Sequence, residues 1–328
     1  SINYAVVKPS IKIIDNAMSN PKAVSPTPGF VYFSAFLLGI FIPFAVISAI
    51  FYLNTKIHTR KQLSNLLADI PIIGEIPYIF DSQKVNNIVS GESRDPIAES
   101  IRMVIANLNF ILFNNSDSKA NNIILITSSV KGEGKTIIST NLAALLSNKY
   151  KRVLLIGADL RNPQIHKFLD LDKNIKGLTD CIYKKDNNWR DYLIKHDNLD
   201  ILLSGTIPPN PNELLSSKRF EQILIELKKE YDYVLIDSAP CLLVSDTFEI
   251  SKFVDTTLYV VRANHSDIKL VDFINESKNQ NKLSNINVLL NGVGSSSAYG
   301  YKYGYQYGYR YSYKYSYNYG YGYGYSED

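Results

Sequence analysis

A glycine-containing segment, Ser128-Ser-Val-Lys-Gly-Glu-Gly-Lys-Thr136, follows an apolar run at 122–128 and opens a helical pattern at 135–148. Between a strand and a helix, this pattern predicts a phosphate-binding loop of the Walker A type. Gly132 and Gly134 allow backbone N–H groups to turn toward a phosphate, and the helix N-terminus adds a favourable dipole. A chance glycine turn is the alternative, and the flanking strand and helix argue against it. The segment therefore predicts an α/β domain with an anion site.

The same loop supplies residues for a nucleotide and a metal ion. Ser129 stands where the general pattern has its first glycine, so the loop is a variant. Lys135 is expected to contact the β- and γ-phosphates of ATP or ADP, and the Thr136 hydroxyl to ligate Mg²⁺. The residues predicted to bind the nucleotide are Ser129, Lys131, Gly132, Glu133, Gly134, Lys135, Thr136 and Ile137.

Strand and helix patterns alternate along the middle of the chain. Runs such as 122–127 and 233–237 are nearly all apolar, which is typical of strands buried on both faces of a parallel sheet. The predicted strands are 122–128, 152–157, 199–203, 232–237, 256–262 and 286–291; the predicted helices are 96–113, 135–148, 212–230, 246–252 and 267–280, with helical pieces across 163–184. We predict a doubly wound, mainly parallel P-loop NTPase domain over residues 80–292.

An uncharged stretch precedes this domain. No charged residue occurs between Ala23 and Thr55, and residues 30–53 are almost wholly apolar. A helix of that length extends about 36 Å, which exceeds a bilayer core of about 30 Å. A buried core helix is the alternative, but soluble helices of this length usually have a polar face. The pattern predicts one transmembrane helix over residues 30–53.

The flanking sequence predicts the orientation of this helix in the membrane. Positive charge next to a span marks the cytoplasmic side and also suits contact with anionic lipid. The basic residues that follow the span are Lys56, His58, Arg60 and Lys61. We therefore expect residues 1–29 to be a proline-containing connector outside the membrane and residues 54–79 to be a juxtamembrane linker inside it.

The C-terminal end, residues 293–328, has a different composition. Every second residue from 299 to 325 is tyrosine, with small or polar residues between. Period-2 alternation suits a sticky β-strand, but the repeated glycines argue against a stable one and favour a disordered tail. The tyrosines are Tyr299, Tyr301, Tyr303, Tyr305, Tyr307, Tyr309, Tyr311, Tyr313, Tyr315, Tyr317, Tyr319, Tyr321, Tyr323 and Tyr325. Such a tail offers many equivalent hydroxyls to one active site.

Two apolar runs end in an aspartate. Asp159 lies in the run 153–163 and Asp237 in the run 233–240. Ligands of open α/β sheets bind at the carboxyl ends of strands, and Mg²⁺ takes carboxylates together with nucleotide phosphates. The predicted metal ligands are Thr136, Asp159 and Asp237, with Asp159 acting on the metal or as the base for a tyrosine proton. A cap or turn is the alternative for each aspartate alone.

Charge and cysteine content exclude other classes. A net charge of +4 is too small to predict a nucleic-acid partner. Cys181 and Cys241 lie far apart without the C-x-x-C spacing of metal or redox sites. They are expected to be inert buried thiols in a reducing compartment.

Three of these elements resemble the Walker A, Walker A′ and Walker B motifs of bacterial tyrosine kinases. Gly132–Thr136 is similar to the kinases' GEGK[ST] loop, and Val130 stands where related partition ATPases carry a signature lysine. The run Asp159-Leu-Arg161-Asn-Pro163 resembles the end of Walker A′. Gly157 departs from the family, which usually has a first aspartate there. The resemblance implies an ATP-dependent protein-tyrosine kinase.

The resemblance also implies roles for particular residues. It names Lys135, Asp159, Asp237 and Arg161 as catalytic, although Arg161 suits a surface ion pair equally well. Asn291 is assigned either to the adenine or to a turn. Glu99 and Arg102 begin a helix motif implicated in subunit contact, with Ile105 where the family has a second arginine. The fourteen tail tyrosines would be phosphoacceptors for a neighbouring subunit.

The proline-rich lead-in and the span resemble the second membrane segment of polysaccharide co-polymerases. This implies a homo-oligomeric ring in the bacterial inner (plasma) membrane, with the kinase domain in the cytoplasm. The implied partners are a cognate protein-tyrosine phosphatase and the proteins of polysaccharide polymerisation and export. Two other hypotheses stay open: an ATP-binding oligomerisation switch of that machinery without kinase activity, and an interaction protein that uses its tyrosine tail.

Overall fold

The computed structural model describes residues 25–78, 95–114, 122–148, 152–184, 188–196 and 199–294. The chain separates into two compact units, Ser1–Asn54 and Thr55–Asp328. The tail tyrosines and most of the predicted N-terminal connector lie outside the described residues.

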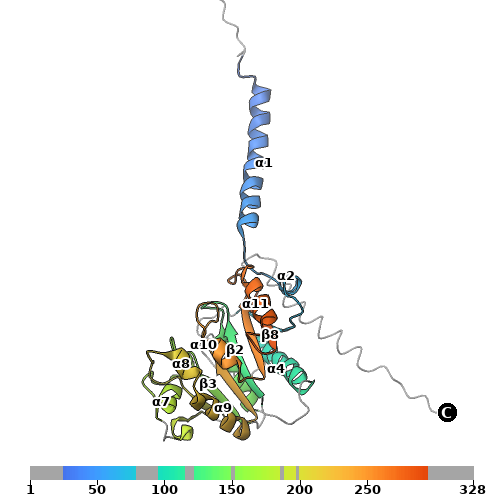
Figure 1. Ribbon diagram of the computed structural model, residues 1–328. Helices are drawn as coiled ribbons and strands as arrows, with labels where there is room; N and C mark the ends of the chain where they lie inside the picture. The colour runs from blue at the N-terminus through green and yellow to red at the C-terminus, as the bar shows by residue number, and fades with distance from the viewer. Residues whose placement is uncertain are drawn as a thin grey trace, which may run out of the picture. The chain divides into compact units, whose positions relative to one another are not determined.

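The first unit contains one long helix, α1 (Pro28–Leu53), close to the predicted 30–53 (Figure 1). The proline at its first turn suits a helix start, because the missing N–H would have no intrahelical partner there. No residue of this helix is buried. In length and composition it could cross a membrane.

The second unit is built on one eight-stranded sheet. Its strands are β1 (Ile72–Pro77), β2 (Asn122–Ser128), β3 (Val153–Gly157), β4 (Ile194–His196), β5 (Leu199–Leu202), β6 (Tyr233–Asp237), β7 (Thr256–Arg262) and β8 (Ile286–Val293). Their order is β1-β8-β7-β2-β6-β3-β5-β4, and every neighbouring pair is parallel except β4 and β5. The prediction of a doubly wound, mainly parallel sheet is confirmed.

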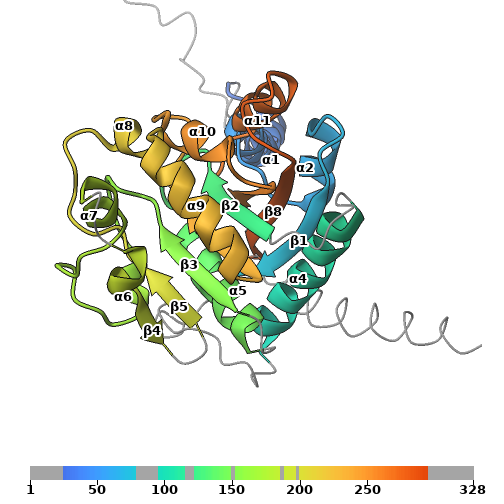
Figure 2. The same ribbon diagram turned by 60° about the horizontal axis from the view of Figure 1, so that its bottom comes forward.

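Helices cover both faces of this sheet, as Figures 1 and 2 show. One face carries α4 (Pro96–Asn114), α5 (Lys135–Ser147) and α6 (Ile165–Phe168). The other carries α2 (Arg60–Leu66), α7 (Leu178–Tyr183), α8 (Pro211–Leu215), α9 (Lys218–Glu230), α10 (Asp246–Ser251) and α11 (Leu270–Asn279), with a short 3₁₀ helix η1 (Trp189–Tyr192).

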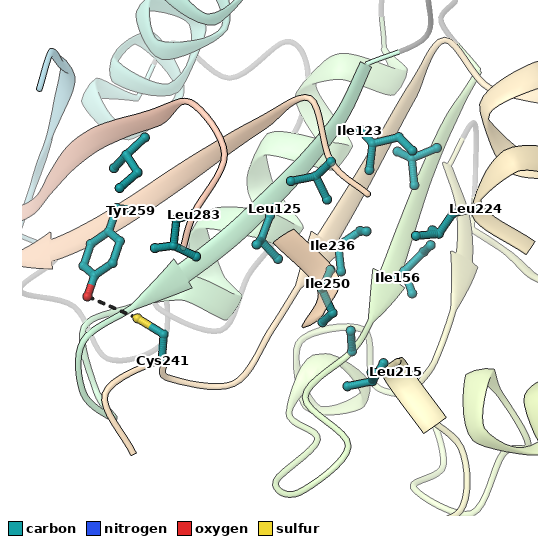
Figure 3. Close-up of a cluster of buried hydrophobic side chains, with 14 of the residues drawn as sticks. Ile123, Leu125, Ile156, Leu215, Leu224, Ile236, Cys241, Ile250, Tyr259 and Leu283 are labelled. Atoms are coloured by element: carbon teal, nitrogen blue, oxygen red, sulfur yellow. Dashed lines mark hydrogen bonds between the residues drawn. The ribbon is translucent and has the colours of Figure 1, made fainter. Parts of the chain in front are cut away.

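The side chains of a strand alternate between the two faces of the sheet, so a strand can contribute to both hydrophobic clusters. In β2, Ile123 and Leu125 belong to one hydrophobic cluster, whereas Ile124 and Ile126 belong to the other. Figure 3 shows part of the first cluster, with Leu125 and Ile236 from adjacent strands pointing into it. Burial on both faces accounts for the continuous apolar runs in the sequence.

Several boundaries differ from the predictions. The helix expected over 212–230 is two helices, because the Ser217 side chain accepts a hydrogen bond from the Phe220 N–H and starts α9 anew. Strand β4 and helix η1 were not predicted, since each spans too few residues to show a period.

Residues 55–78, within the segment predicted to be a juxtamembrane linker, belong to the second unit. Ile57 and Leu63 are fully buried, and β1 pairs in parallel with β8 at the edge of the sheet. Lys278 Nζ on α11 donates to the carbonyl of Asp69, which ties the segment to the second layer (2.8 Å). The domain therefore starts near Thr55, and the boundary predicted at residue 80 was wrong.

Helix α4 corresponds to the helix predicted over 96–113 and buries one of its faces. Ile101, Val104, Ile105 and Leu108 are each at most 2% exposed. The side chain of Ile105 thus lies in the core, where an arginine would lose its hydration.

Candidate nucleotide-binding site

The Walker A loop joins β2 to α5. Gly132 and Gly134 have φ angles of 88° and 99°, a left-handed region that favours glycine. A Cβ atom at Gly134 would overlap the side-chain amide of Asn291, so the position has no room for a larger residue. Lys135 and Thr136 form the first turn of α5, where the N–H groups of a helix lack intrahelical partners.

Four predicted residues come together in front of this loop. The Lys135 ammonium lies 3.5 Å from Asp159 Oδ2, and the Thr136 hydroxyl donates to Asp237 Oδ2 over 2.9 Å. Strands β3 and β6 are adjacent and in register at Gly157 and Asp237, which brings both acids to one edge of the sheet. All four of these side chains are buried or nearly so.

Asp237 is the most perturbed acid of the site. It is 1% exposed, and burial raises the pKa of its carboxyl to about 6, although Lys135 and the Thr136 hydroxyl act in the opposite direction. Its Oδ1 atom is buried and, within the described residues, has no hydrogen-bond partner. A buried acceptor without a donor is a costly arrangement unless a ligand uses it.

This donor set fits a magnesium ion bound together with a nucleotide. The described residues contain no group of three or more histidine, cysteine or acidic side chains that could hold a metal alone. Mg²⁺ usually keeps several waters and takes one or two carboxylates plus phosphate oxygens. The Thr136 hydroxyl and the free oxygen of Asp237 are suitable ligands for an ion of that kind.

The back of the loop is held by hydrogen bonds to the side chain of Glu133, one of them from Ser266, which lies outside the predicted motifs. Ser266 donates to Glu133 Oε1, and the Val130 N–H donates to Glu133 Oε2 over 2.8 Å. Glu133 is fully buried, and burial raises the pKa of its carboxyl. The side chain of Glu133 therefore points into the protein, which leaves its backbone N–H for the predicted contact with the nucleotide.

Three more side chains touch the back of the loop. His265 Nε2 donates to the carbonyl of Lys131 (3.2 Å), Arg262 Nη1 to that of Gly132 (2.8 Å) and Asn291 Nδ2 to that of Glu133 (2.9 Å). Of the two roles considered for Asn291, the structure favours a structural contact, made with the loop. Sequence reasoning missed Arg262, His265 and Ser266, because single residues after a strand give no recognisable spacing.

Ser129 and Ile137 also face inward. The Ser129 hydroxyl lies 2.9 Å from the Tyr259 hydroxyl, which in turn lies 3.3 Å from Cys241 Sγ (Figure 3). Ile137 packs against the hydrophobic cluster on the face of the sheet that carries α4, α5 and α6. Burial raises the pKa of the Cys241 and Cys181 thiols to about 11 each, which agrees with the prediction of inert buried thiols.

The comparisons with known proteins agree with this geometry. A family model described as an AAA domain matches residues 121–287, more than half of the chain. A putative tyrosine-protein kinase in the cps region of Klebsiella pneumoniae is 32% identical over 301 residues, which cover 87% of this chain and 41% of the relative. The chain belongs to the AAA-domain family.

Other relatives match at similar levels. The tyrosine-protein kinase etk of Escherichia coli K12 is 30% identical over 325 residues, covering 92% of this chain and 44% of the relative. The solved kinase domain of Escherichia coli tyrosine kinase ETK superposes with a TM-score of 0.65 at 28% identity, covering 74% of this chain and 98% of that domain. The chain spans less than half the length of the curated relatives it matches.

The structure shows little space for a side chain at Gly157, where the bacterial tyrosine kinases usually have an aspartate. A Cβ atom at Gly157 would lie 2.8 Å from the Ser204 hydroxyl and 3.1 Å from the Ser204 backbone nitrogen. An aspartate there would require the backbone at Ser204 to move. The second acid, Asp159, accepts the N–H of Asn162 over 2.9 Å, so its carboxylate is oriented by the local turn and by Lys135.

Two other residues named by the resemblance make contacts inside the second unit. Arg161 donates to both oxygens of Asp246 on α10 (2.7 and 3.1 Å), and this pairing raises the pKa of the guanidinium. Of the two roles considered for Arg161, this contact corresponds to the ion pair. Arg102 pairs with Glu99 one turn earlier on α4 (2.5 Å), so both predicted subunit-contact residues lie on one surface of that helix.

Proposed function

We propose that this chain is the membrane-anchored kinase part of a longer protein and that it transfers the γ-phosphoryl group of ATP to protein tyrosines. The observation that carries the proposal is the convergence of Lys135, Thr136, Asp159 and Asp237 on one Walker loop. The family relatives named as tyrosine-protein kinases support the same chemistry.

In the proposed reaction, a tyrosine oxygen forms a bond to the γ-phosphorus while the bond to the ADP oxygen breaks. Lys135 neutralises the charge on the transferred group, and the loop N–H groups hold the phosphates. Asp159 accepts the phenolic proton, because a tyrosine with a pKa of about 10 stays protonated near neutral pH. Magnesium, bound by Thr136 and Asp237, would supply further charge neutralisation on the phosphate oxygens.

The proposed substrates are the fourteen tyrosines between residues 299 and 325 of a neighbouring copy. The residues after 294 carry three basic and two acidic side chains, a net charge of +1. Each phosphate adds about −1.5 to −2 charges, so a few transfers reverse the sign of this segment. Unmodified tails would then favour a ring of subunits, with Glu99 and Arg102 at the contacts, and phosphorylated tails would leave it.

The proposed location is the bacterial inner membrane, with α1 as the anchor and the kinase domain in the cytoplasm. The basic residues that follow α1 support this orientation. The proposed partners are polysaccharide polymerisation and export proteins and a cognate tyrosine phosphatase. They rest on the resemblance of the lead-in and span to polysaccharide co-polymerases.

The test is autophosphorylation of the full chain in detergent with ATP and Mg²⁺, followed with an anti-phosphotyrosine antibody. We expect signal in the wild type and none in Lys135→Ala or in a protein that ends at residue 294. Mixing Lys135→Ala with the tailless protein should restore signal if transfer occurs between subunits. ATP binding without signal in any sample would instead support a nucleotide switch.

A further inference from the structure

Three consecutive carbonyl groups of the Walker loop are bound from behind by side chains distant in sequence. The carbonyl of Lys131 accepts from His265, that of Gly132 from Arg262, and that of Glu133 from Asn291, over 3.2, 2.8 and 2.9 Å. Each side chain lies at or just after the carboxyl end of β7 or within β8.

These bonds fix which way the opposite peptide groups point. In a planar trans peptide, the N–H of one residue points away from the carbonyl of the residue before it. The N–H groups of Gly132, Glu133 and Gly134 therefore point toward the front of the loop. In the described part of the chain, none of the three donates to a protein acceptor.

We propose that Arg262, His265 and Asn291 are positioning residues of the nucleotide site. By holding the carbonyls of residues 131–133, they aim the N–H groups of residues 132–134 at the phosphates without touching the nucleotide. The inference rests on the proposed binding of ATP and adds the residues that preorganise it. A loop that must reorient its own peptides on binding would bind phosphate more weakly.

The anchors themselves are fixed to the domain. The N–H of Arg262 donates to the Ser266 hydroxyl (2.9 Å), and the N–H of Ala263 to the carbonyl of Asn291 (2.8 Å). The N–H of Asn264 donates to the carbonyl of Ile57, a fully buried residue (2.7 Å). The turn that carries Arg262 and His265 is thus closed by its own hydrogen bond and tied to two other segments, and it is suited to act as a rigid support.

The first test compares two asparagine substitutions in the full chain, with Mg-ADP as the ligand. Asn291→Leu keeps the shape of the side chain, adds no charge and removes the donor to the loop. Asn275→Leu is the matched control, because Asn275 Nδ2 also donates to a backbone carbonyl, that of Leu66, over 2.9 Å. We expect the Kd for Mg-ADP to rise about tenfold in Asn291→Leu and less than about twofold in the control.

The second test separates positioning from a loss of stability. Arg262→Met should weaken Mg-ADP binding about tenfold, and Arg262→Lys should recover part of it by restoring a donor. The melting temperature without nucleotide should fall equally in Asn291→Leu and Asn275→Leu, while the rise caused by Mg-ADP shrinks only in the first. Unchanged affinity in both Asn291→Leu and Arg262→Met, or an equal loss in the control, overturns the inference. A wild type that binds no Mg-ADP overturns the proposed function instead.

Discussion

The two sides of the Walker loop differ in how their buried carboxylates are hydrogen-bonded. We call the side with Lys135 and Asp237 the front and the side with Glu133 the back. At the front, Asp237 is buried with one oxygen unpartnered among the described residues. At the back, both oxygens of Glu133 accept hydrogen bonds from the protein. Buried polar groups stabilise a fold only when they are satisfied. The front therefore lowers the stability of the free protein and is available to a ligand, whereas the back stabilises the loop that the ligand needs.

The largest loss of stability and of nucleotide binding should come from deleting residues 55–78, which support the back of the loop. A protein beginning at residue 80 lacks Ile57, which is fully buried and bonds to the turn at 264–266. It also lacks β1, which exposes the edge of β8. We expect it to lose cooperative unfolding and nucleotide binding, because deleting several buried side chains at about 2–5 kcal/mol each exceeds the stability of a typical domain.

Urea denaturation followed by circular dichroism checks this expectation. The matched comparison is a protein that begins at Thr55 and keeps all the contacts of the second unit. Two cooperative transitions of equal midpoint would show that residues 55–78 do not support the loop.

The next prediction concerns the front, where removing a charge should increase the stability of the free protein. Asp237→Asn should weaken Mg-ADP binding at least tenfold, yet raise the free energy of unfolding of the free protein at pH 7.5 by up to about 3 kcal/mol. The folded-state pKa lies at about 6, above the ordinary 3.8, so the carboxyl favours folding fully only below pH 3.8. This contribution is lost as the pH rises through 6, and the neutral amide avoids that loss.

Urea denaturation at pH 7.5 and at pH 4 measures this difference. The gain in stability should be present at pH 7.5 and small at pH 4, where Asp237 is mostly protonated. Asp159→Asn is the control, because it breaks the pair with Lys135 and should show no such gain. A less stable Asp237→Asn protein at pH 7.5 would contradict the idea that the front costs stability.

The difference between front and back also explains what the sequence could predict. Lys135 and Thr136 follow from local spacing, and Asp159 and Asp237 from the rule that parallel strands end at one edge. Arg262 and His265 contact single carbonyl groups, which any donor of suitable length can reach, so no spacing marks them. Likewise, β1 lies in a segment predicted to be a linker, because its partner β8 lies more than 200 residues later in the chain.

A smaller loss of stability is expected when a hydrogen bond at the back of the loop is removed. Ser266→Ala removes a donor from the buried carboxylate of Glu133, and the free energy of unfolding should fall by about 1–3 kcal/mol. Affinity for Mg-ADP should fall only a few-fold, because the Val130 N–H still holds the other oxygen. The control is Ser277→Ala, since the Ser277 hydroxyl is buried without a partner in the described part of the chain and its removal should not destabilise the protein. Equal losses in the two variants would remove any special role for Ser266.

The smallest effect concerns Arg161, which the motif places at the front and the structure pairs with Asp246. The Arg161 side chain is 45% exposed, so solvent weakens the pair and its coupling energy should be about 1 kcal/mol. A double-mutant cycle with Arg161→Gln and Asp246→Asn measures that coupling. If Arg161 only orients the turn after Asp159, Arg161→Lys should keep kcat within about tenfold of the wild type, since an amine can still pair with Asp246. A loss of kcat beyond about a hundredfold in Arg161→Lys, with no coupling to Asp246, would place the guanidinium on the transferred phosphoryl group and return this residue to the front of the loop.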